Sequence, residues 1–498
     1  MMGAAADLPR FGQDDVVEYA AAILGKRDVP ALDARTIAGC LTASPPLPGI
    51  PRVLAPGEPE LEAESRNRKF GIPIANEVVC ELTDIGNEFW SCLPWCGQAV
   101  LCLKKAGLMN PIESQTFNFF PVPTDVHFGL GVLQTLPVQV KSLGAQKAFL
   151  VTDPGLRAAG ILDQIVGLLQ AHSIPVTVCD RVVADSGSKL IDSTVMELKQ
   201  SGADIVIGVG GGSSLDTAKA IGALATNPGS CLDYIGLHNV RNKSLPVIAI
   251  PTTAGTGSEV TLWSVFTDED KKIKTAIGSF LLYPSIALCD PELTLNLPPH
   301  LTASTGMDAL GHAIECYTNN ACQPISAALA LRAIELIGYY LRSAVLNGRD
   351  RQSRYGMMLA STMAGIAMNP TRLGLAHALA MPLGSWNLRV PHGIAVAVTL
   401  PVVMEFNYLA EPGRFADVAR ALGCRIDHLT RLDAARCSID AVRSLLSDLG
   451  ISTSLSGYGL REEHVRPVVD EAIKSGNVTV NPRRTTSEDL EQILRRVL

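Results

Sequence analysis

The chain has 498 residues, of which 47% are hydrophobic and 18% are charged, and its formal net charge is −7. These values favour a folded protein of two or three domains and argue against disorder along the whole chain. The acidic balance and the lack of any basic stretch argue against a nucleic-acid partner.

We expect neither a membrane span nor export. The sequence has no run of about 18 apolar residues, the length that a spanning helix needs. Acidic Asp7, Asp14 and Asp15 stand where a signal peptide would need a basic start and an apolar core. Twelve cysteines without a disulfide framework favour reduced thiols. The sequence therefore predicts a cytoplasmic setting.

Residues 1–116 form an N-terminal extension that differs from the rest of the chain. Apolar residues recur at helical spacing from Asp14 to Leu24, and Gly25 ends this amphipathic helix. A proline-rich linker over residues 45–59 follows, and then an apolar segment from Phe70 to Leu108. We expect the apolar segment to pack against another protein surface.

Residues 117–297 alternate apolar runs with helical patterns, which predicts an α/β domain whose parallel sheet is covered on both faces. The predicted strands cover residues 148–152, 176–179, 205–209 and 246–250, and the helices between them include 161–171 and 190–200.

Residues 298–498 carry helical patterns only, beginning after Pro298 and Pro299, and predict an all-α domain. The predicted helices cover residues 301–317, 325–341, 355–367, 415–422, 439–449 and 487–497. The cleft between the two domains is the expected ligand site.

Two glycine-rich turns follow predicted strands. Gly210 to Lys219 places three glycines and Ser213 at the start of a helix, where backbone N–H groups and the positive helix end favour a phosphate. A plain strand-to-helix turn is the alternative. In Pro251 to Thr261, hydroxyl side chains suit contacts with a nucleotide. Asp153 ends a strand, where a carboxylate would bind ribose hydroxyls and favour NAD over NADP. A helix N-cap is the alternative for Asp153.

An Asp and three His form a candidate metal site. Asp308 and His312 are four residues apart on a predicted helix and share one face. His377 and His392 lie in apolar surroundings further on. Any one of these histidines alone is more often an ordinary core residue. Together, the N/O set suits Fe(II), Zn(II), Mn(II) or Co(II), and such a metal is a Lewis acid for an alcohol or a carbonyl oxygen.

The motifs together resemble the iron-containing (type III) alcohol dehydrogenase family, from about Phe117 to the C-terminus. The resemblance implies a Rossmann-like dinucleotide-binding domain, related to that of dehydroquinate synthase, followed by a helical domain. It implies that Asp308, His312, His377 and His392 bind the metal, with Fe(II) first and Zn(II) or Mn(II) as alternatives. The implied NAD-binding residues are Asp153, Gly210, Gly211, Gly212, Ser213, Asp216, Thr252, Thr253, Thr256 and Lys274.

The predicted function is therefore reversible hydride transfer between a small primary alcohol and NAD, an oxidoreductase activity. Many family members carry another His four residues after the third ligand, and here that position is Met381. A thioether cannot relay a proton. Three alternatives stay open: a reductase specialised for a small anionic aldehyde, a hydroxyacid–oxoacid transhydrogenase, and a non-catalytic binding or scaffold protein.

The extension suggests two kinds of partner. An amphipathic helix followed by a proline-rich linker resembles peptides that direct enzymes into bacterial microcompartments, so residues 1–30 are a candidate for shell or cargo contact. A helix packed on its own catalytic domain or on a neighbouring subunit is the alternative. The resemblance also implies a homodimer or a higher homo-oligomer.

Overall fold

The computed structural model describes residues 122–385, 388 and 390–498. Contacts group Thr116–Leu498 into one compact unit. The expected helix of Asp14 to Leu24, the proline-rich linker and the apolar segment from Phe70 to Leu108 lie outside the described residues. The predictions for residues 1–116 therefore stay predictions.

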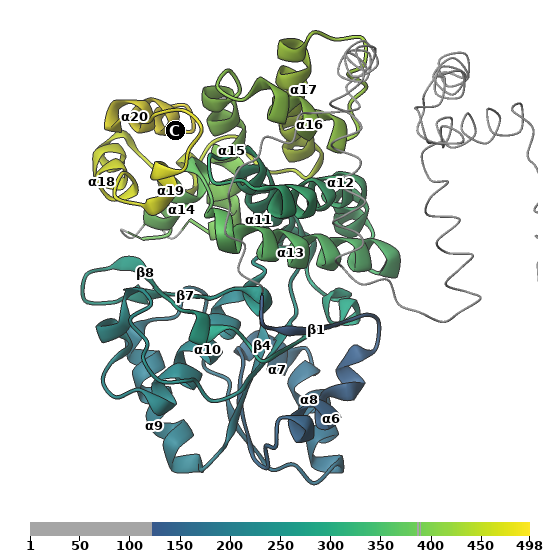
Figure 1. Cartoon of the computed structure of the whole chain (residues 1–498), viewed down its shortest axis with the longest axis vertical. Helices are drawn as coiled ribbons and strands as arrows, with labels where there is room; N and C mark the ends of the chain where they lie inside the picture. Colours follow the sequence, from purple (N-terminus) through teal and green to yellow (C-terminus); the bar gives the residue numbers. More distant parts are fainter. Residues whose placement is uncertain (1–121, 386–387, 389) are drawn as a thin grey trace, which may run out of the picture. The chain divides into compact units, whose positions relative to one another are not determined.

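A six-stranded parallel sheet forms the first part of the described chain (Figure 1). The strand order is β1-β9-β6-β4-β2-β3. The strands are β1 (Asp125–Phe128), β2 (Ala148–Val151), β3 (Val176–Cys179), β4 (Ile205–Gly210), β6 (Val247–Pro251) and β9 (Ile286–Cys289). The four predicted runs correspond to β2, β3, β4 and β6. The prediction did not include β1, whose four residues alternate too little to stand out, or β9, a short buried run.

Helices cover both faces of this sheet, as predicted. The helices are α6 (Leu136–Ser142), α7 (Pro154–Ala158), α8 (Ile161–Ala171), α9 (Ser188–Ser201) and α10 (Gly212–Thr226). Along β2, Phe149 belongs to the buried cluster that includes residues of α9 and α10, and the next residue, Leu150, belongs to the cluster that includes α6 and α8. Successive residues of a strand point to opposite faces, so both faces are buried.

A second, smaller sheet lies outside the prediction. It has three strands in the order β5-β8-β7, with bounds β5 (Gly236–Leu237), β7 (Trp263–Asp268) and β8 (Ile273–Gly278). β7 and β8 are antiparallel neighbours. This hairpin directly follows the second glycine-rich turn and carries Lys274.

Helices make up the remainder of the described chain, and no strand follows β9 within it. The helices are α11 (Pro299–Thr318), α12 (Pro324–Leu346), α13 (Arg351–Thr371), α14 (Leu375–Leu383), α15 (His392–Asn407), α16 (Pro412–Ala421), α17 (Arg431–Asp448), α18 (Glu462–Ala472), α19 (Gly476–Thr479) and α20 (Ser487–Arg495). The predicted class, a parallel α/β part followed by a helical part, is confirmed. The prediction did not include α14, α15, α18 and α19. α14 and α15 are apolar on nearly every face, so they lack a helical period.

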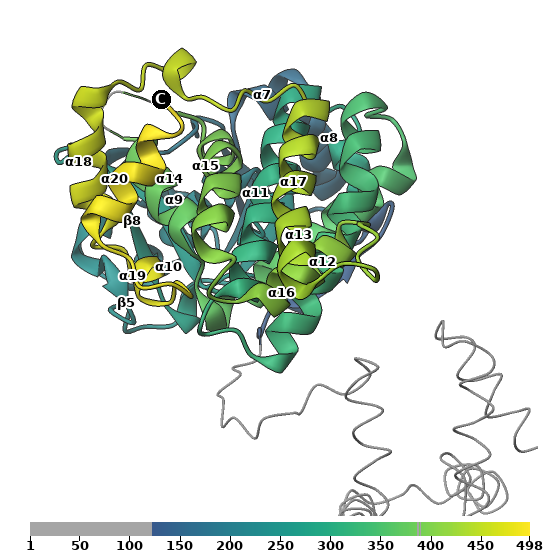
Figure 2. The ribbon, with the colours of Figure 1, turned by 90° about the horizontal axis from the view of Figure 1, so that it is seen from above.

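α11 runs through the interior of the helical part, in contact with α12, α13 and α15 (Figure 2). Sixteen of its residues are buried, including Asp308 and His312. Within the described ranges, α12 is the one helix that is long and apolar enough to cross a membrane by length and composition. Its buried residues belong to the same apolar cluster as those of α11 and α13, which accounts for its composition.

Gly208 lets α10 pack closely on the sheet, and this contact gives a first prediction. A β-carbon at Gly208 in β4 would lie 2.6 Å from that of Ala218 in α10. We expect Gly208→Ala to lower stability by about 1–3 kcal/mol, because overpacking must push the helix away. Exposed Gly167 in α8 has no atom within 4 Å of such a β-carbon and is the matched control.

We expect Gly167→Ala to raise stability by about 0.5–1 kcal/mol, since alanine is the better helix former. Thermal unfolding followed by circular dichroism at one scan rate measures both variants. Equal melting temperatures for the two variants would contradict the close packing of α10 on β4.

Candidate metal centre and nucleotide-binding turns

The first glycine-rich turn lies where β4 ends and α10 begins. Gly210 has φ +145°, a conformation open chiefly to glycine. α10 begins at Gly212, and no side chain caps its N-terminus, so its first backbone N–H groups can face an anion. The backbone N–H of Thr252, in the second turn, donates to the Gly210 carbonyl at 3.0 Å. The two turns therefore start side by side on neighbouring strands.

The second turn closes over the first because glycines leave room for its threonines. A β-carbon at Gly212 would lie 2.7 Å from Thr256 Cγ2, and one at Gly211 would lie 3.5 Å from Thr253 Cγ2. Ser213 Oγ accepts the backbone N–H of Asp185 at 3.2 Å. The structure thus brings the predicted phosphate residues and the predicted threonines to the carboxyl edge of the sheet, where open α/β sheets bind their ligands.

Asp153 caps a helix and also lies beside the first turn. Its Oδ1 accepts the backbone N–H groups of Gly155 at 2.8 Å and Leu156 at 3.1 Å, which makes it the N-cap of α7. Its Oδ2 lies 3.3 Å from the position of a β-carbon at Gly210. Asp153 is therefore a helix N-cap through Oδ1. Its Oδ2 faces the first glycine-rich turn, where a ribose contact is predicted.

Asp216 has a different environment from the one predicted. Its Oδ1 accepts Ser258 Oγ–H at 2.5 Å and pairs with Lys219 Nζ at 2.9 Å, and its Oδ2 accepts the Val265 N–H at 2.9 Å. Fully buried Lys219 also donates to the carbonyls of Ser258 and Trp263. Both oxygens of Asp216 are thus engaged inside the protein. Asp216 thus holds the second turn against α10, and its contact with a cofactor stays a prediction.

Lys274 connects the small sheet with the metal region. Its Nζ pairs with Asp185 Oδ1 at 2.6 Å, and its side chain is 4% exposed. Its backbone N–H donates to Ser385 Oγ at 3.2 Å, and a β-carbon at Gly384 would lie 2.6 Å from Nζ. The ammonium therefore lies against the end of α14, and its charge helps to lower the pKa of His392.

Three of the four predicted metal ligands form a tight cluster. Ligand atoms of Asp308 (α11), His377 (α14) and His392 (the first residue of α15) lie within 4.8 Å of one another. Asp308 Oδ1 is 3.5 Å from His377 Nε2 and 3.6 Å from His392 Nε2. Asp308 Oδ1 and His377 Nε2 are buried without a hydrogen-bond partner. Buried polar atoms rarely stay unpaired, and a cation between these two would fit the residues present.

His312 lies next to this cluster but outside its tightest group. Its ring stacks on that of His377 with centroids 4.5 Å apart. His312 Nδ1 is 3.2 Å from the carbonyl oxygen of Gly255 in the second glycine-rich turn. A carbonyl only accepts, so Nδ1 carries the proton and Nε2 keeps its lone pair for a metal. This hydrogen bond ties the predicted metal site to the predicted cofactor turn.

The electrostatics of the cluster favour a cation. Burial lowers the pKa of His312 to about 4 and that of His392 to about 3. Burial also acts to lower the pKa of His377, but the carboxylates of Glu315 and Asp308 outweigh it and raise that pKa to about 9. Burial acts to raise the pKa of Asp308, but the three imidazoles hold it below its usual range. His312 and His392 are therefore neutral, with ring lone pairs free for a metal, and the ionised Asp308 supplies negative charge beside them.

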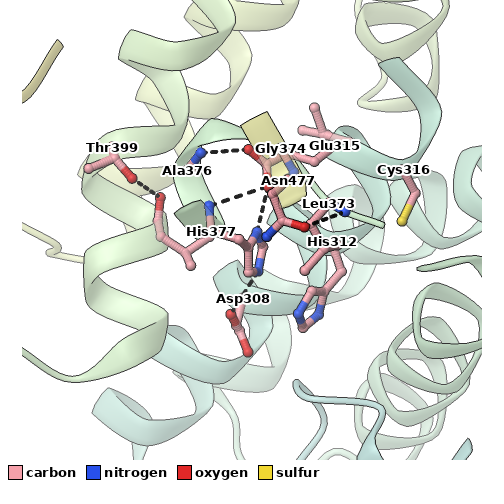
Figure 3. Close-up of polar contacts among 12 residues, drawn as sticks. Asp308, His312, Glu315, Cys316, Leu373, Gly374, Ala376, His377, Thr399 and Asn477 are labelled. Carbon is pink, nitrogen blue, oxygen red and sulfur yellow. Dashed lines mark hydrogen bonds and ion pairs between the residues drawn. The ribbon is translucent and has the colours of Figure 1, made fainter. Parts of the chain in front are cut away.

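Glu315 is a residue that the sequence analysis missed. It lies on α11 three residues after His312 and accepts a hydrogen bond from His377 Nδ1 at 2.5 Å (Figure 3). Asp308, His312 and Glu315 share a helical spacing of i, i+4 and i+7. That spacing is the signal that could have placed Glu315 on the same face as the ligands.

The second glycine-rich turn is hydrogen-bonded through Gly255 to the buried Asp–His cluster, an arrangement expected of an enzyme that uses a nucleotide together with a metal. Two family models match the chain: iron-containing alcohol dehydrogenase over residues 123–291, and the C-terminal part of the same family over residues 302–498. The chain therefore belongs to the iron-containing alcohol dehydrogenase family and is an oxidoreductase.

This chain matches similar proteins over nearly all of their own length. Choline dehydrogenase of Bacillus subtilis is 39% identical over 77% of this chain and 96% of its own length. NAD-dependent methanol dehydrogenase of Bacillus methanolicus is 37% identical over 76% of this chain and 100% of its own. The solved structure of a 1,3-propanediol oxidoreductase is 38% identical, with a TM-score of 0.75 over 77% of this chain and 100% of that one.

Metal retention tests the cluster. We expect Asp308→Asn to reduce bound divalent metal from about one ion per chain to near zero, because an amide loses the charge that the buried site needs. His300→Ala is the matched control, since His300 is exposed on the same helix. Elemental analysis after gel filtration measures both variants. Equal metal content in Asp308→Asn and His300→Ala would place the metal elsewhere.

Proposed function

We propose that this oxidoreductase is a metal-dependent, NAD(H)-linked alcohol dehydrogenase or aldehyde reductase. The observation that carries the proposal is the hydrogen bond between His312 Nδ1 and the Gly255 carbonyl. It joins the Asp–His cluster to the turn whose threonines pack on the glycines at the start of α10. The proposed metal site and the proposed nucleotide site would thus be neighbours, as hydride transfer to a nicotinamide requires.

Asp308, His312, His377 and His392 would hold the metal, and Fe(II) is our proposal for its identity on the family's description and this N/O ligand set. When bound, a divalent metal supplies Lewis acidity toward an alcohol or carbonyl oxygen, and NAD supplies the hydride acceptor. The chain contributes orientation and charge. The cluster is closed by protein on the sides of Asp308 and His377, and His392, with a side chain 30% exposed, marks the side open to solvent.

The residues of the two turns would bind the nucleotide. Backbone N–H groups at the start of α10 and Ser213 would hold the pyrophosphate, and Thr253 and Thr256 would contact it from the facing turn. The Lys219–Asp216 pair keeps that facing turn in place from behind. Asp153 Oδ2 would contact the ribose, where its charge repels a 2′-phosphate.

The proton of the alcohol needs a path that does not use residue 381. Met381 is half-buried on α14, one turn after His377. Its thioether neither donates a proton nor binds one at neutral pH. We infer that the proton leaves through ribose hydroxyls or water on the open side of the cluster.

A second candidate is a reductase for small aldehydes that carry an anionic group. The observation that favours it is the buried ammonium of Lys274 beside the cluster, close enough to lower the pKa of His392. Asp185 pairs with this ammonium in the structure, so an anionic substrate would have to compete with that carboxylate. Aldehydes with and without a carboxylate or sulfonate, compared at equal length, separate the two candidates.

The cytoplasmic setting, the homo-oligomeric state and the contacts of residues 1–30 with a microcompartment stay proposals that rest on the sequence. Fluorescence of a reporter fused to residues 1–30, in cells that make shells, tests the last of them. Size-exclusion chromatography with light scattering tests the oligomeric state.

A panel of alcohols and aldehydes with NAD(H), assayed on metal-loaded protein, tests the proposed function. We expect turnover that disappears on chelation and returns with divalent metal. His312→Ala should lower kcat/KM by at least about 100-fold, because it removes both a ligand and the bond to Gly255. Activity that persists in His312→Ala after the metal is removed would contradict the proposal.

Asp153→Asn tests cofactor choice separately from helix capping. Asparagine keeps a side-chain oxygen for the N–H groups of Gly155 and Leu156 and removes the charge. We expect the ratio of kcat/KM for NAD over NADP to fall by about 10-fold, with little change in stability, because a 2′-phosphate is no longer repelled. Initial rates with both cofactors measure the ratio. An unchanged ratio would leave Asp153 as a helix cap only.

A further inference from the structure

Glu315 is a buried carboxylate that receives hydrogen bonds from α14 and from a metal-site histidine. Its side chain is 4% exposed. Its Oε2 accepts His377 Nδ1–H at 2.5 Å and the Gly374 N–H at 2.9 Å, and its Oε1 accepts the Ala376 N–H at 2.7 Å (Figure 3). A further N–H, that of His377, is 3.4 Å from Oε2. A single side chain of α11 thus accepts hydrogen bonds from the backbone N–H groups at the start of α14.

α14 has no cap of its own. Its N-cap residue is Gly374, which has no side chain to offer, so the carboxylate of Glu315 takes that role from another helix. A β-carbon at Gly374 would lie 2.7 Å from Glu315 Oε1. The negative charge also faces the positive end of α14. The start of α14, and with it the place of His377, is therefore fixed by α11.

The turn that leads into α14 is strained and is held by the same end of α11. Arg372 has φ +61°, a backbone conformation that is unfavourable for residues other than glycine. Asn319, at the end of α11, donates to the carbonyls of Thr371, Arg372 and Leu373. Such a conformation persists only where its surroundings impose it, so the path of the chain toward His377 is imposed from α11.

The charge of Glu315 has no Lys or Arg partner among the described residues; its one ion-pair partner there is His377. Asp308 lies on the other side of the same imidazole, with Oδ1 3.5 Å from Nε2. With the imidazoles neutral, as metal binding requires, the two buried carboxylates carry a charge of about −2, which is costly to bury uncompensated. A divalent cation at the cluster would bring the sum to about zero.

We propose that Glu315 is a positioning residue of the metal site. Its carboxylate keeps the proton of His377 on Nδ1, which leaves the Nε2 lone pair facing Asp308, and its charge offsets that of the cation through the imidazole. This inference rests on the proposed function, because it takes Asp308, His312, His377 and His392 as the ligands. The atoms that act are Glu315 Oε2 and His377 Nδ1.

Metal affinity of the folded protein tests the role of Glu315. Apo-protein is titrated with Co(II) against a competing chelator, and the visible absorption of the bound Co(II) reports its coordination. We expect Glu315→Gln, which keeps the shape and one acceptor, to weaken Co(II) binding by about 10-fold, and Glu315→Leu, which removes every acceptor, by about 100-fold. Both variants should also change the absorption of bound Co(II).

Thr318→Val is the matched control. Thr318 is buried on the same helix, and its hydroxyl donates to the carbonyl of Ile314 in its own helix at 2.8 Å. We expect this variant to bind Co(II) as the unchanged protein does. If Glu315→Gln binds Co(II) with unchanged affinity and absorption, the proposal is overturned, even if the variant unfolds at a lower temperature, since that would show a helix cap and nothing more.

A readout without metal separates this inference from the proposed function. ¹⁵N NMR of histidine-labelled apo-protein, recorded at a pH above the raised pKa of His377, reports which imidazole nitrogen of this residue carries the single proton. We expect Nδ1–H in the unchanged protein and loss of that preference in Glu315→Leu. If the unchanged protein binds no metal at the cluster, the proposed function fails, and the tautomer of His377 still decides for or against Glu315. The same tautomer in both proteins would overturn its role.

Discussion

The cost of burying charge on α11 is the constraint on which the helical part of the structure depends. Asp308 and Glu315 place two carboxylates inside the protein, where an isolated charge is unfavourable by several kcal/mol. Groups from other helices contact each carboxylate. Glu315 is contacted by His377 and by backbone N–H groups of α14, and Asp308 is contacted by the imidazoles of His377 and His392. The positions of α14 and α15 are thus determined by what α11 must neutralise.

Close approach of backbone to backbone is the corresponding constraint in the α/β part. Gly208 lets α10 pack on the sheet, and Gly212 lets the second turn reach the start of that helix. Gly255 extends the same contact to α11, because a β-carbon there would lie 2.7 Å from that of Thr305. These glycines therefore allow contact between elements as well as turn geometry, and they bring the two glycine-rich turns close to the Asp–His cluster.

The fold class was predictable because its main signals are local. Buried strands such as β4 are continuous apolar runs. The four-residue spacing of Asp308 and His312 indicates that they share one helical face. The rest depends on contacts between distant segments. Asp153 could be recognised as both a cap and a neighbour of the first turn only once α7 and Gly210 were placed. The internal role of Asp216 could not be read from the sequence, because its partners Ser258 and Val265 lie more than 40 residues away. Glu315 depends on α14, whose apolar sequence has no helical period.

If a metal and a nucleotide bind as proposed, the hydrogen bond between His312 and Gly255 would make the two binding events thermodynamically dependent on each other. A nucleotide that alters the second turn alters the carbonyl that holds the His312 ring, and an ion that orients the ring alters the turn. Linkage requires that each ligand change the affinity for the other by the same factor. A mutation in the second turn would therefore change ion retention without changing any of the proposed ligands.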